Sequence, residues 1–318
     1  MFKFNEIEDL LQIKNLNHPL VHFETLEEIS IKGKAYPIHG ITIGSKDKTL
    51  PTLGLIGGVH GLERIGSQII ISFLQSLLNQ LNWDKVLYEN FSNYRIVCIP
   101  ILNPGGMVSL SRCNPNNVDL MRNAPVEASG KILPLLSGHR ISPHLPWYRG
   151  SDGVLEKETK VLITFLQDEV FSSKVSIVLD VHSGFGLKDQ IWYPFAKSQE
   201  RFPLLDEVLR LKDLLDRSYP HHIYKIEPQS KNYMTHGDLW DYLFELHAKS
   251  NVKNNSIFLP LTLELGSWSW IKKNPLQFFS KLGLFHPLKK HRHSRIMRRH
   301  LNLLDFLMRA TRNHESWL

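Results

Sequence analysis

Short apolar runs alternate along the chain with segments in which apolar residues recur at helical spacing. The short runs predict buried strands at residues 53–56, 94–101, 176–181 and 258–265. The segments with helical spacing predict helices at residues 65–81, 156–170, 202–217, 275–282 and 292–312. Strands and helices that alternate in this way indicate an α/β layer architecture.

The 318 residues show no internal repeat, low-complexity tract or Gly/Ser linker, so we expect a single domain over residues 1–318. A chain of this length buries enough apolar surface to fold without disulfides or a structural metal. Between residues 124 and 153 lies a stretch rich in Pro, Gly, Ser and His with no clear period. Long irregular stretches in compact domains are often functional, and this one is a candidate lid or specificity loop.

The cysteine content and the N-terminus predict a cytoplasmic protein without a membrane partner. There are two cysteines, Cys98 and Cys113, and the first lies in an apolar run that favours a buried, inert thiol. Acidic residues interrupt the N-terminal nine residues, where a signal peptide needs an apolar stretch. No uncharged apolar run approaches the ~18 residues of a membrane span.

The net charge of +7 raises the question of nucleic acid. Much of the positive excess lies in residues 289–300, which lead into a helical pattern. We interpret this run as a solvated face of a C-terminal helix rather than a nucleic-acid footprint, and we do not expect nucleic acid as a partner.

Polar residues follow four of the predicted strands. His60 and Glu63 follow the strand at 53–56, Asn103 follows the strand at 94–101, and His182 and Glu264 end the strands at 176–181 and 258–264. Ligands of open α/β sheets bind outside the carboxyl ends of the strands. We therefore expect these side chains to meet at one edge of the sheet.

The residue types at these strand ends suit zinc chemistry. His60 and Glu63 are three residues apart, and His182 completes a set of two histidines and one carboxylate. Catalytic zinc usually takes three protein ligands and leaves a fourth position for water. Glu264 is a carboxylate inside an apolar strand, either partnered structurally or acting as a general base. Asp180 is in phase with His182 and either orients that ligand or makes a simple structural hydrogen bond.

The ordered motifs resemble those of the zinc carboxypeptidase family and its aspartoacylase/succinylglutamate desuccinylase relatives. The matching residues lie in family order between residues 60 and 264. They are His60-x-x-Glu63, Asn103-Pro104, Arg112, Asp119-Leu120-x-Arg122-Asn123, Asp180-x-His182-Ser183 and Glu264.

This resemblance implies a mixed, mostly parallel eight-stranded sheet with helices on both faces. It also implies that His60, Glu63 and His182 bind one zinc ion and that Glu264 activates water. Arg112 would then polarise the scissile carbonyl, and Arg122 would hold a substrate carboxylate. Tyr233 is similar to a mobile tyrosine that covers the substrate, while a packing role for it is the alternative.

Two positions depart from the family pattern. Met121 stands where the family has an asparagine that shares the carboxylate grip, and Leu62 stands where the pancreatic-type enzymes carry an arginine. Either the asparagine's part in binding the carboxylate is missing in this chain, or neighbouring Asn123 takes it over. Neither change touches the metal ligands or Glu264.

The function we expect is a zinc-dependent metallocarboxypeptidase that removes the C-terminal residue of a small peptide. The alternative is a deacylase that acts on N-acyl amino acids. From outside this class, a catalytically silent binding protein with the same fold is the remaining hypothesis, and the completeness of the site disfavours it. The sequence carries no signal of an oligomeric state.

Overall fold

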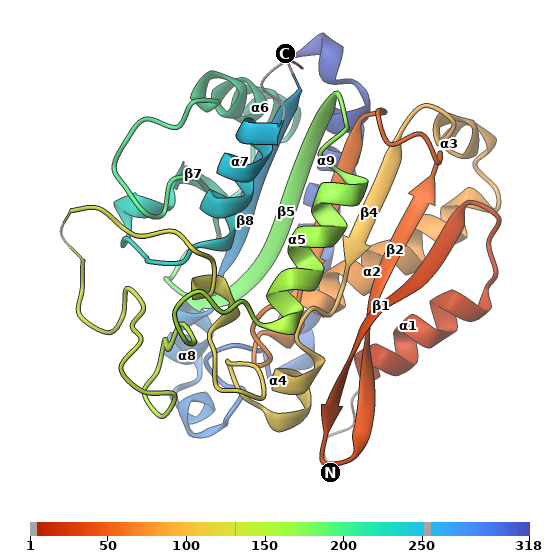
Figure 1. Ribbon diagram of the computed structural model, residues 1–318. Helices are drawn as coiled ribbons and strands as arrows, with labels where there is room; N and C mark the ends of the chain where they lie inside the picture. Colours follow the sequence, from red (N-terminus) through yellow and green to blue (C-terminus); the bar gives the residue numbers. More distant parts are fainter. Residues whose placement is uncertain (1–4, 131, 251–255) are drawn as a thin grey trace.

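A sheet lies between two layers of helices in the computed structural model, which describes residues 5–130, 132–250 and 256–318 (Figure 1). Residues 1–4 of the N-terminal segment and residue 131 of the irregular stretch lie outside these residues. Within the described part of the chain, eight strands form one sheet in the order β1-β2-β4-β3-β5-β8-β6-β7. Their bounds are β1 Val21–Ile31, β2 Lys34–Gly44, β3 Thr52–Gly57, β4 Arg95–Ile99, β5 Val175–Phe185, β6 Gln190–Tyr193, β7 Lys225–Pro228 and β8 Ile257–Gly266.

The centre of the sheet is parallel and its flanks are mixed. Strands β4, β3, β5 and β8 are parallel neighbours, and β6 pairs with β7 in the same way. The pairs β1/β2, β2/β4 and β6/β8 are antiparallel. Because β3, β5 and β8 run in one direction, their carboxyl ends meet at one edge. The expectation of a mixed, mostly parallel eight-stranded sheet is confirmed.

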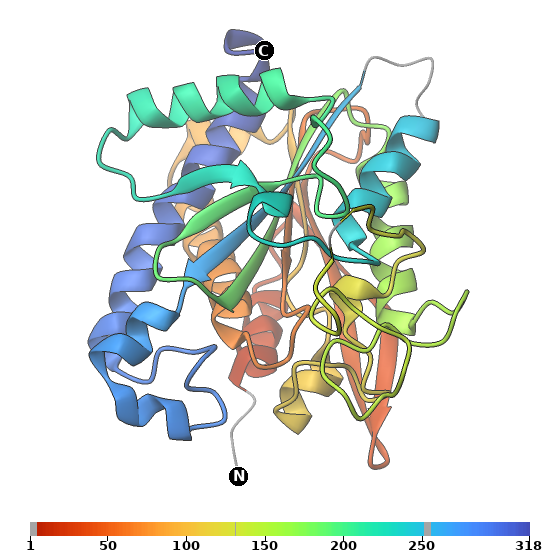
Figure 2. The same ribbon diagram turned by 90° about the vertical axis from the view of Figure 1, so that its left-hand side faces the viewer.

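Helices cover both faces of this sheet, as Figure 2 shows with the sheet nearly edge-on. Helices α1, α2 and α9 pack together on one face, and α5 and α7 pack on the other. Helix α6 lies beside α9, where the rings of Tyr219 and Phe306 are 5.8 Å apart. The bounds are α1 Asn5–Asn15, α2 Arg64–Leu81, α3 Lys85–Asn90, α4 Pro104–Ser109, α5 Lys157–Glu169, α6 Leu205–Ser218, α7 Leu239–Ser250, α8 Trp268–Lys273 and α9 Lys290–Arg312.

Helix α2 places the turn that precedes it against the end of β5. Its apolar stripe, from Ile65 to Leu81, is buried as the periodicity predicts. A Cβ atom at Gly66 would lie 2.3 Å from the carbonyl oxygen of Val181, so only glycine permits this approach. The close contact brings the residues just before α2 next to the residue that follows Val181.

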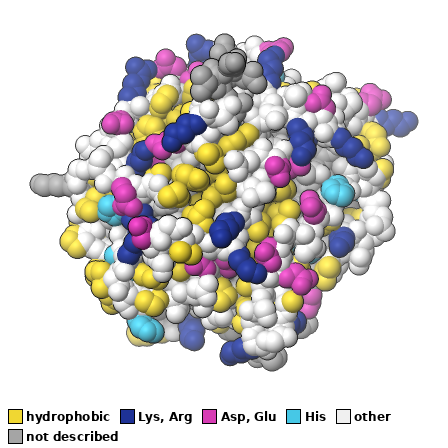
Figure 3. Space-filling view, viewed as in Figure 1, with side chains coloured by type: hydrophobic (Ala, Val, Ile, Leu, Met, Phe, Trp, Pro, Cys, Tyr) yellow, Lys and Arg dark blue, Asp and Glu magenta, His cyan; other side chains and the backbone are white. Residues whose placement is uncertain are grey.

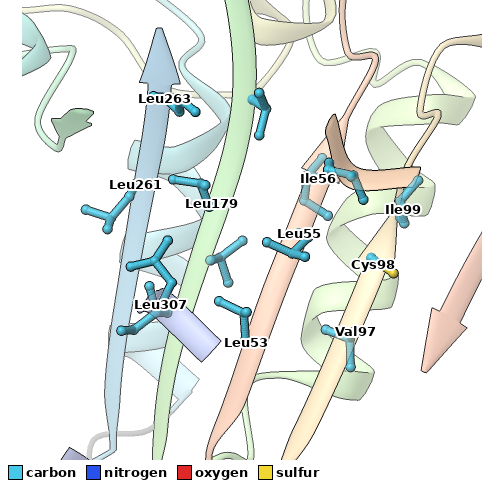
Figure 4. Packing of buried hydrophobic residues seen from close by; sticks show 14 of the residues in the cluster. Leu53, Leu55, Ile56, Val97, Cys98, Ile99, Leu179, Leu261, Leu263 and Leu307 are labelled. Atoms are coloured by element: carbon cyan, nitrogen blue, oxygen red, sulfur yellow. The ribbon is translucent and has the colours of Figure 1, made fainter. Parts of the chain in front are cut away.

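The core fills both sides of the central strands. Figure 4 shows leucine and isoleucine side chains of β3, β4, β5 and β8 together with Leu307 of α9. Cys98 belongs to this cluster, fully buried, and burial raises the pKa of its thiol. The expectation that Cys98 is a buried thiol is therefore confirmed.

The elements that the patterns predict lie at the expected places, with one exception. The predicted helix at 275–282 is wrong, because residues Pro275–Phe279 form a single 3₁₀ turn, η3, and turns follow up to residue 289. Three further 3₁₀ turns are η1 Leu120–Arg122, η2 Gln229–Lys231 and η4 His314–Ser316. Residues 124–130 and 132–153 are irregular, as expected. Within the described residues, no helix is long and apolar enough to cross a membrane.

Candidate active site

The turn after β3 and the ends of β5 and β8 bring four polar side chains together. His60 and Glu63 lie between β3 and α2, and His182 and Glu264 are register partners on the adjacent strands β5 and β8. All four are buried, with at most 7 % of each residue exposed, yet all four line one cavity of about 460 Å³. The predicted convergence at the carboxyl edge of the sheet is therefore what the structure shows.

Asn103 follows β4, but its side chain makes hydrogen bonds to backbone groups. Its side-chain Oδ1 accepts a hydrogen bond from the amide of Gly106 at 2.7 Å and caps α4. Its Nδ2 donates to the carbonyl of Val59 at 3.1 Å. Asn103 thus joins α4 to the turn that carries His60.

His60, Glu63 and His182 form a compact set of potential metal ligands. Their donor atoms lie within 4.8 Å of one another. The Nδ1 atoms of both histidines face Glu63, at 2.9 Å from its Oε1 for His60 and 3.0 Å from its Oε2 for His182. The backbone amide of Ser183 also donates to Glu63 Oε2, at 2.9 Å. Two imidazoles and one carboxylate in this arrangement match the donor chemistry of a catalytic zinc site.

A carboxylate fixes the outer nitrogen of each histidine. His60 Nε2 lies 3.1 Å from Asp119 Oδ1, and His182 Nε2 lies 2.6 Å from Asp180 Oδ2. The indole of Trp240 donates to the same Asp180 oxygen at 2.9 Å. Carboxylates that hold the second nitrogen of a ligating histidine set its tautomer and orient its ring. Of the two roles considered for Asp180, orientation of His182 is the one that its contact supports.

Asp119 joins His60 to two arginines. Arg112 Nε donates to Asp119 Oδ2 at 3.0 Å, and Arg112 Nη1 donates to Glu63 Oε1 at 3.0 Å. Arg122 Nη1 donates to Asp119 Oδ2 at 2.9 Å. Burial alone would raise the pKa of Asp119, but Arg112, Arg122 and His60 outweigh it and hold that pKa well below its usual range. Asp119 is therefore charged, and its carboxylate holds His60 and the two arginines in place.

Both arginines line the cavity. The side chain of Arg112 remains one-quarter exposed, so its guanidinium is accessible from the cavity. Burial lowers the pKa of Arg112, but Asp119 and Glu63 outweigh it and the net shift is upward. Arg122 uses Nε and Nη2 on the carbonyl of Leu136 at 3.2 and 3.1 Å. Three of the five N–H groups of Arg122 are thus engaged, and two remain for a ligand.

Glu264 lies at the end of β8 with one oxygen engaged. Its Oε1 accepts a hydrogen bond from the amide of Phe185 at 2.9 Å. Burial, together with the nearby charge of Glu63, raises the pKa of Glu264 to about 8. A carboxyl group in such surroundings takes up and releases a proton near neutral pH.

The structure does not bring Asn123 into the cavity, which corrects the expectation that Asn123 helps to bind a substrate carboxylate. Its Nδ2 donates to the carbonyls of Arg149 and Val154 at 2.9 and 3.0 Å. Its Oδ1 accepts from the amide of Glu156 at 2.8 Å. These bonds join the irregular stretch to the start of α5 and leave Asn123 no group for a substrate. Met121, by contrast, lines the cavity.

Tyr233 lines the same cavity among aromatic side chains. Its ring lies 5.5 Å from that of Phe185 and 6.0 Å from that of Trp192. Burial raises the pKa of Tyr233 to about 12, so its hydroxyl is protonated at neutral pH. Tyr233 is thus in a position to contact a ligand, and the aromatic contacts also fit the packing alternative.

The sequence patterns gave no role to several residues that the structure places at the site. Asp119 is the central one: it belongs to the motif Asp119-Leu120-x-Arg122-Asn123, and a 3₁₀ turn converts its spacing of three from Arg122 into contact. The amide of Ser183 and the indole of Trp240 carry no sequence signal of this kind. Gln229, Thr235, Asp238 and Thr262 also line the cavity.

Comparisons with known proteins agree with this arrangement. A family model described as zinc carboxypeptidase matches residues 15–267. The chain is 23% identical over 235 residues to carboxypeptidase SOL1 of Arabidopsis thaliana, covering 71% of this chain and 42% of the relative. It is 22% identical over 232 residues to mast cell carboxypeptidase A of Rattus norvegicus, covering 67% of this chain and 53% of the relative. The chain thus spans about half the length of these curated relatives or less.

Solved structures share the fold. The crystal structure of thrombin activatable fibrinolysis inhibitor aligns with a TM-score of 0.70 at 18% identity, covering 97% of this chain and 73% of that chain. Carboxypeptidase A from Helicoverpa armigera aligns with a TM-score of 0.70 at 16% identity, covering 98% and 74%. At these identities the likeness concerns the fold alone. The family match, which extends over most of the chain and includes every residue of the cluster, leads to one conclusion: this chain belongs to the zinc carboxypeptidase family.

Proposed function

We propose that the chain is a metallocarboxypeptidase that uses one zinc ion held by His60, Glu63 and His182. The observation that carries the proposal is the convergence of two Nδ1 atoms and the Glu63 carboxylate beside Glu264 in one cavity. Zinc in such a site supplies a Lewis acid that makes water a nucleophile at neutral pH and polarises a carbonyl.

Glu264 is the group that handles protons. Its carboxyl end lies in the cavity, and only one of its oxygens bonds to the backbone. In the proposed reaction the carboxylate takes a proton from the attacking water and then gives it to the leaving amine. The raised pKa of Glu264 favours the first transfer, because a carboxylate whose conjugate acid has a pKa near the working pH is a stronger base than an ordinary carboxylate.

Arg112 and Arg122 divide the recognition of charge. Arg112 faces the cavity from beside Glu63, where its guanidinium would hold the oxygen that gains negative charge in the transition state. Arg122 is more deeply buried, and two of its N–H groups are not used in the hydrogen bonds to Asp119 and Leu136. These two groups would grip the terminal carboxylate of a peptide in a bidentate manner.

The test is a cleavage assay with purified, zinc-loaded protein, followed by mass spectrometry. The panel holds peptides with a free C-terminus, the same peptides amidated at the C-terminus, and N-acyl amino acids. Loss of one terminal residue from the free peptides alone, absent in a Glu264→Gln variant that still holds zinc, is the expected result. Cleavage restricted to N-acyl amino acids would make the protein a deacylase and overturn the peptide assignment.

A further inference from the structure

The segment between α8 and α9 is built with a polar side chain inside and apolar side chains outside. Gln277 is buried, with 1 % of the residue exposed. Its neighbours Leu276, Phe278 and Phe279 are exposed by 77 %, 59 % and 85 %. Soluble surfaces carry single exposed apolar residues routinely, but three large ones around one turn need a reason.

Hydrogen bonds hold this turn in its conformation. The side-chain Nε2 of Gln277 donates to the carbonyl of Gly283 at 2.7 Å and to that of His286 at 3.0 Å. A Cβ atom at Gly283 would lie 1.6 Å from the carbonyl oxygen of Gln277, so the backbone at Gly283 packs directly against the backbone at Gln277. The turn therefore closes around an amide and directs the phenylalanines outward.

Positive charge gathers in this segment and in the helices on either side of it. Residues 265–304 contain nine of the 38 Lys and Arg residues and none of the 31 Asp and Glu residues, so the rest of the chain has a slight negative excess. Five exposed lysines lie within fifteen residues of the apolar turn in the sequence. In the part of the chain that the structure describes, no carboxylate pairs with them. They are Lys272, Lys273, Lys281, Lys289 and Lys290.

One face of the molecule shows no comparable separation of charge. The face seen in Figure 3 carries basic and acidic side chains interspersed with hydrophobic ones. Helix α8 and the segment after it lie at the lower left of Figure 2, at the end of the molecule towards which β8 runs. Trp268 of α8 and Phe285 of the following turns both line the catalytic cavity. The charged apolar surface is thus continuous with the mouth of the site.

We propose that residues 272–290, here named the 272–290 surface, dock the protein onto the surface of an anionic lipid bilayer. Exposed aromatic and leucine side chains enter the interfacial region of a bilayer, and lysines around them pair with anionic headgroups. Such docking needs no membrane-spanning segment, and it differs from the sequence-based expectation that the chain has no membrane partner. When the protein is docked in this way, its catalytic cavity opens beside the bilayer.

The ring geometry favours a lipid over a nucleic-acid partner. Aromatic residues that bind single strands stack on successive bases, which requires accessible and similarly oriented ring faces. The rings of Phe278 and Phe279 are inclined by 87°, with centroids 6.0 Å apart. Leu276, the second most exposed of the three, offers no stacking face. Insertion into acyl chains makes no such demand on orientation.

The experiment is co-sedimentation of the full chain with vesicles. One vesicle is pure phosphatidylcholine, and the other contains about 30% phosphatidylglycerol, a content that gives a strongly anionic surface. We expect binding to the anionic vesicles only, weakened by raising the salt from about 0.1 to about 0.5 M because the Debye length shortens. Phe278→Ser/Phe279→Ser should weaken binding about tenfold or more, since two apolar rings no longer leave water. Lys281→Gln/Lys289→Gln should weaken it as well.

Matched variants elsewhere on the surface control for non-specific effects of removing exposed apolar side chains or positive charge. Trp83→Ser/Val86→Ser removes two exposed apolar side chains, one just before α3 and one in its first turn, and Lys32→Gln/Lys46→Gln removes two exposed lysines. Both controls should bind as the wild type does, and all variants should keep its melting temperature. Equal binding by the Phe278→Ser/Phe279→Ser variant, or no binding to either vesicle, would overturn the proposal. Binding to a single-stranded RNA oligonucleotide that this variant loses, without vesicle binding, would replace it with a nucleic-acid surface.

Discussion

The Nδ1 atoms of His60 and His182 lie 3.2 Å apart and face each other. The Nε2 atom of each ring points to a carboxylate, which favours a proton on Nε2 and leaves a lone pair on Nδ1. Two such lone pairs repel each other unless positive charge lies between them. The turn before α2 and the end of β5 therefore hold the rings in an arrangement that a cation stabilises.

Loss of the carboxylate behind His182 should weaken zinc binding without unfolding the protein. Asp180→Asn keeps the size of the side chain but removes the charge that fixes the His182 tautomer. We expect zinc affinity to fall about 10- to 100-fold, as for outer partners of other metal sites. Competition with a chromogenic chelator measures the affinity. Trp240→Phe, which removes only the indole bond to Asp180, should have a smaller effect. Equal affinities of wild type and Asp180→Asn would contradict the role given to this carboxylate.

The two arginines should differ in which kinetic constant they control. Arg112→Met should lower kcat by about 10²- to 10³-fold, because the lost donor acts on charge that develops in the transition state. Arg122→Met should raise KM for peptides with a free C-terminus by about 10- to 100-fold, the equivalent of a lost charge-assisted hydrogen bond. Steady-state kinetics on both variants at full zinc occupancy gives the comparison. The opposite split, with Arg112 acting on KM and Arg122 on kcat, would exchange their assignments.

How far the fold could be predicted depended on the length and burial of each element. Strands β3 and β8 are buried along nearly their whole length and read as apolar runs. Strands β6 and β7 have only four residues each, too few for a recognisable pattern. The helix expected at 275–282 failed because apolar spacing was taken as a buried face, whereas Leu276, Phe278 and Phe279 point to solvent.

The site was predictable to the extent that each side chain sits at a strand end. His60, Glu63, His182 and Glu264 all follow from that rule and from zinc chemistry. Asn123 was misplaced because adjacency in sequence to Arg122 says nothing about direction. The 3₁₀ turn η1 ends at Arg122, and the next side chain points towards Arg149 and α5 instead. Contacts across the chain of this kind carry no local sequence signal.

The buried ion pair between α1 and α2 should contribute strongly to stability. Arg64 Nε donates to Glu6 Oε1 at 2.9 Å, and Gln68 Nε2 donates to the same oxygen at 2.7 Å. Glu6→Ala leaves the Arg64 charge buried without this carboxylate, which typically costs about 3–5 kcal/mol. Urea unfolding followed by circular dichroism measures the loss. Glu8→Ala, at an exposed position on the same helix, is the matched control and should stay within about 0.5 kcal/mol of the wild type. A loss for Glu6→Ala no larger than for Glu8→Ala would show that the pair contributes nothing.

Acid should destabilise the protein through His300 well above the pH at which most carboxylates titrate. His300 is fully buried on α9, and its Nδ1 lies 2.9 Å from the hydroxyl of Tyr224. Burial lowers the pKa of His300 to about 4, compared with 6.5 for an exposed histidine. Between these two values the unfolded chain binds a proton that the folded chain does not, so folding stability falls as the pH falls.

At pH 5 this difference amounts to about 2 kcal/mol relative to pH 8. Denaturant unfolding at pH 8, 7, 6 and 5 gives the profile. His300→Asn offers a hydrogen-bonding group near the position of Nδ1 but does not titrate, so its stability should decline less between pH 7 and pH 5 than that of the wild type. The lower absolute stability expected for the variant does not affect this comparison, because the slope with pH carries the result. Parallel profiles for the two proteins would show that a buried neutral His300 does not cause the acid sensitivity.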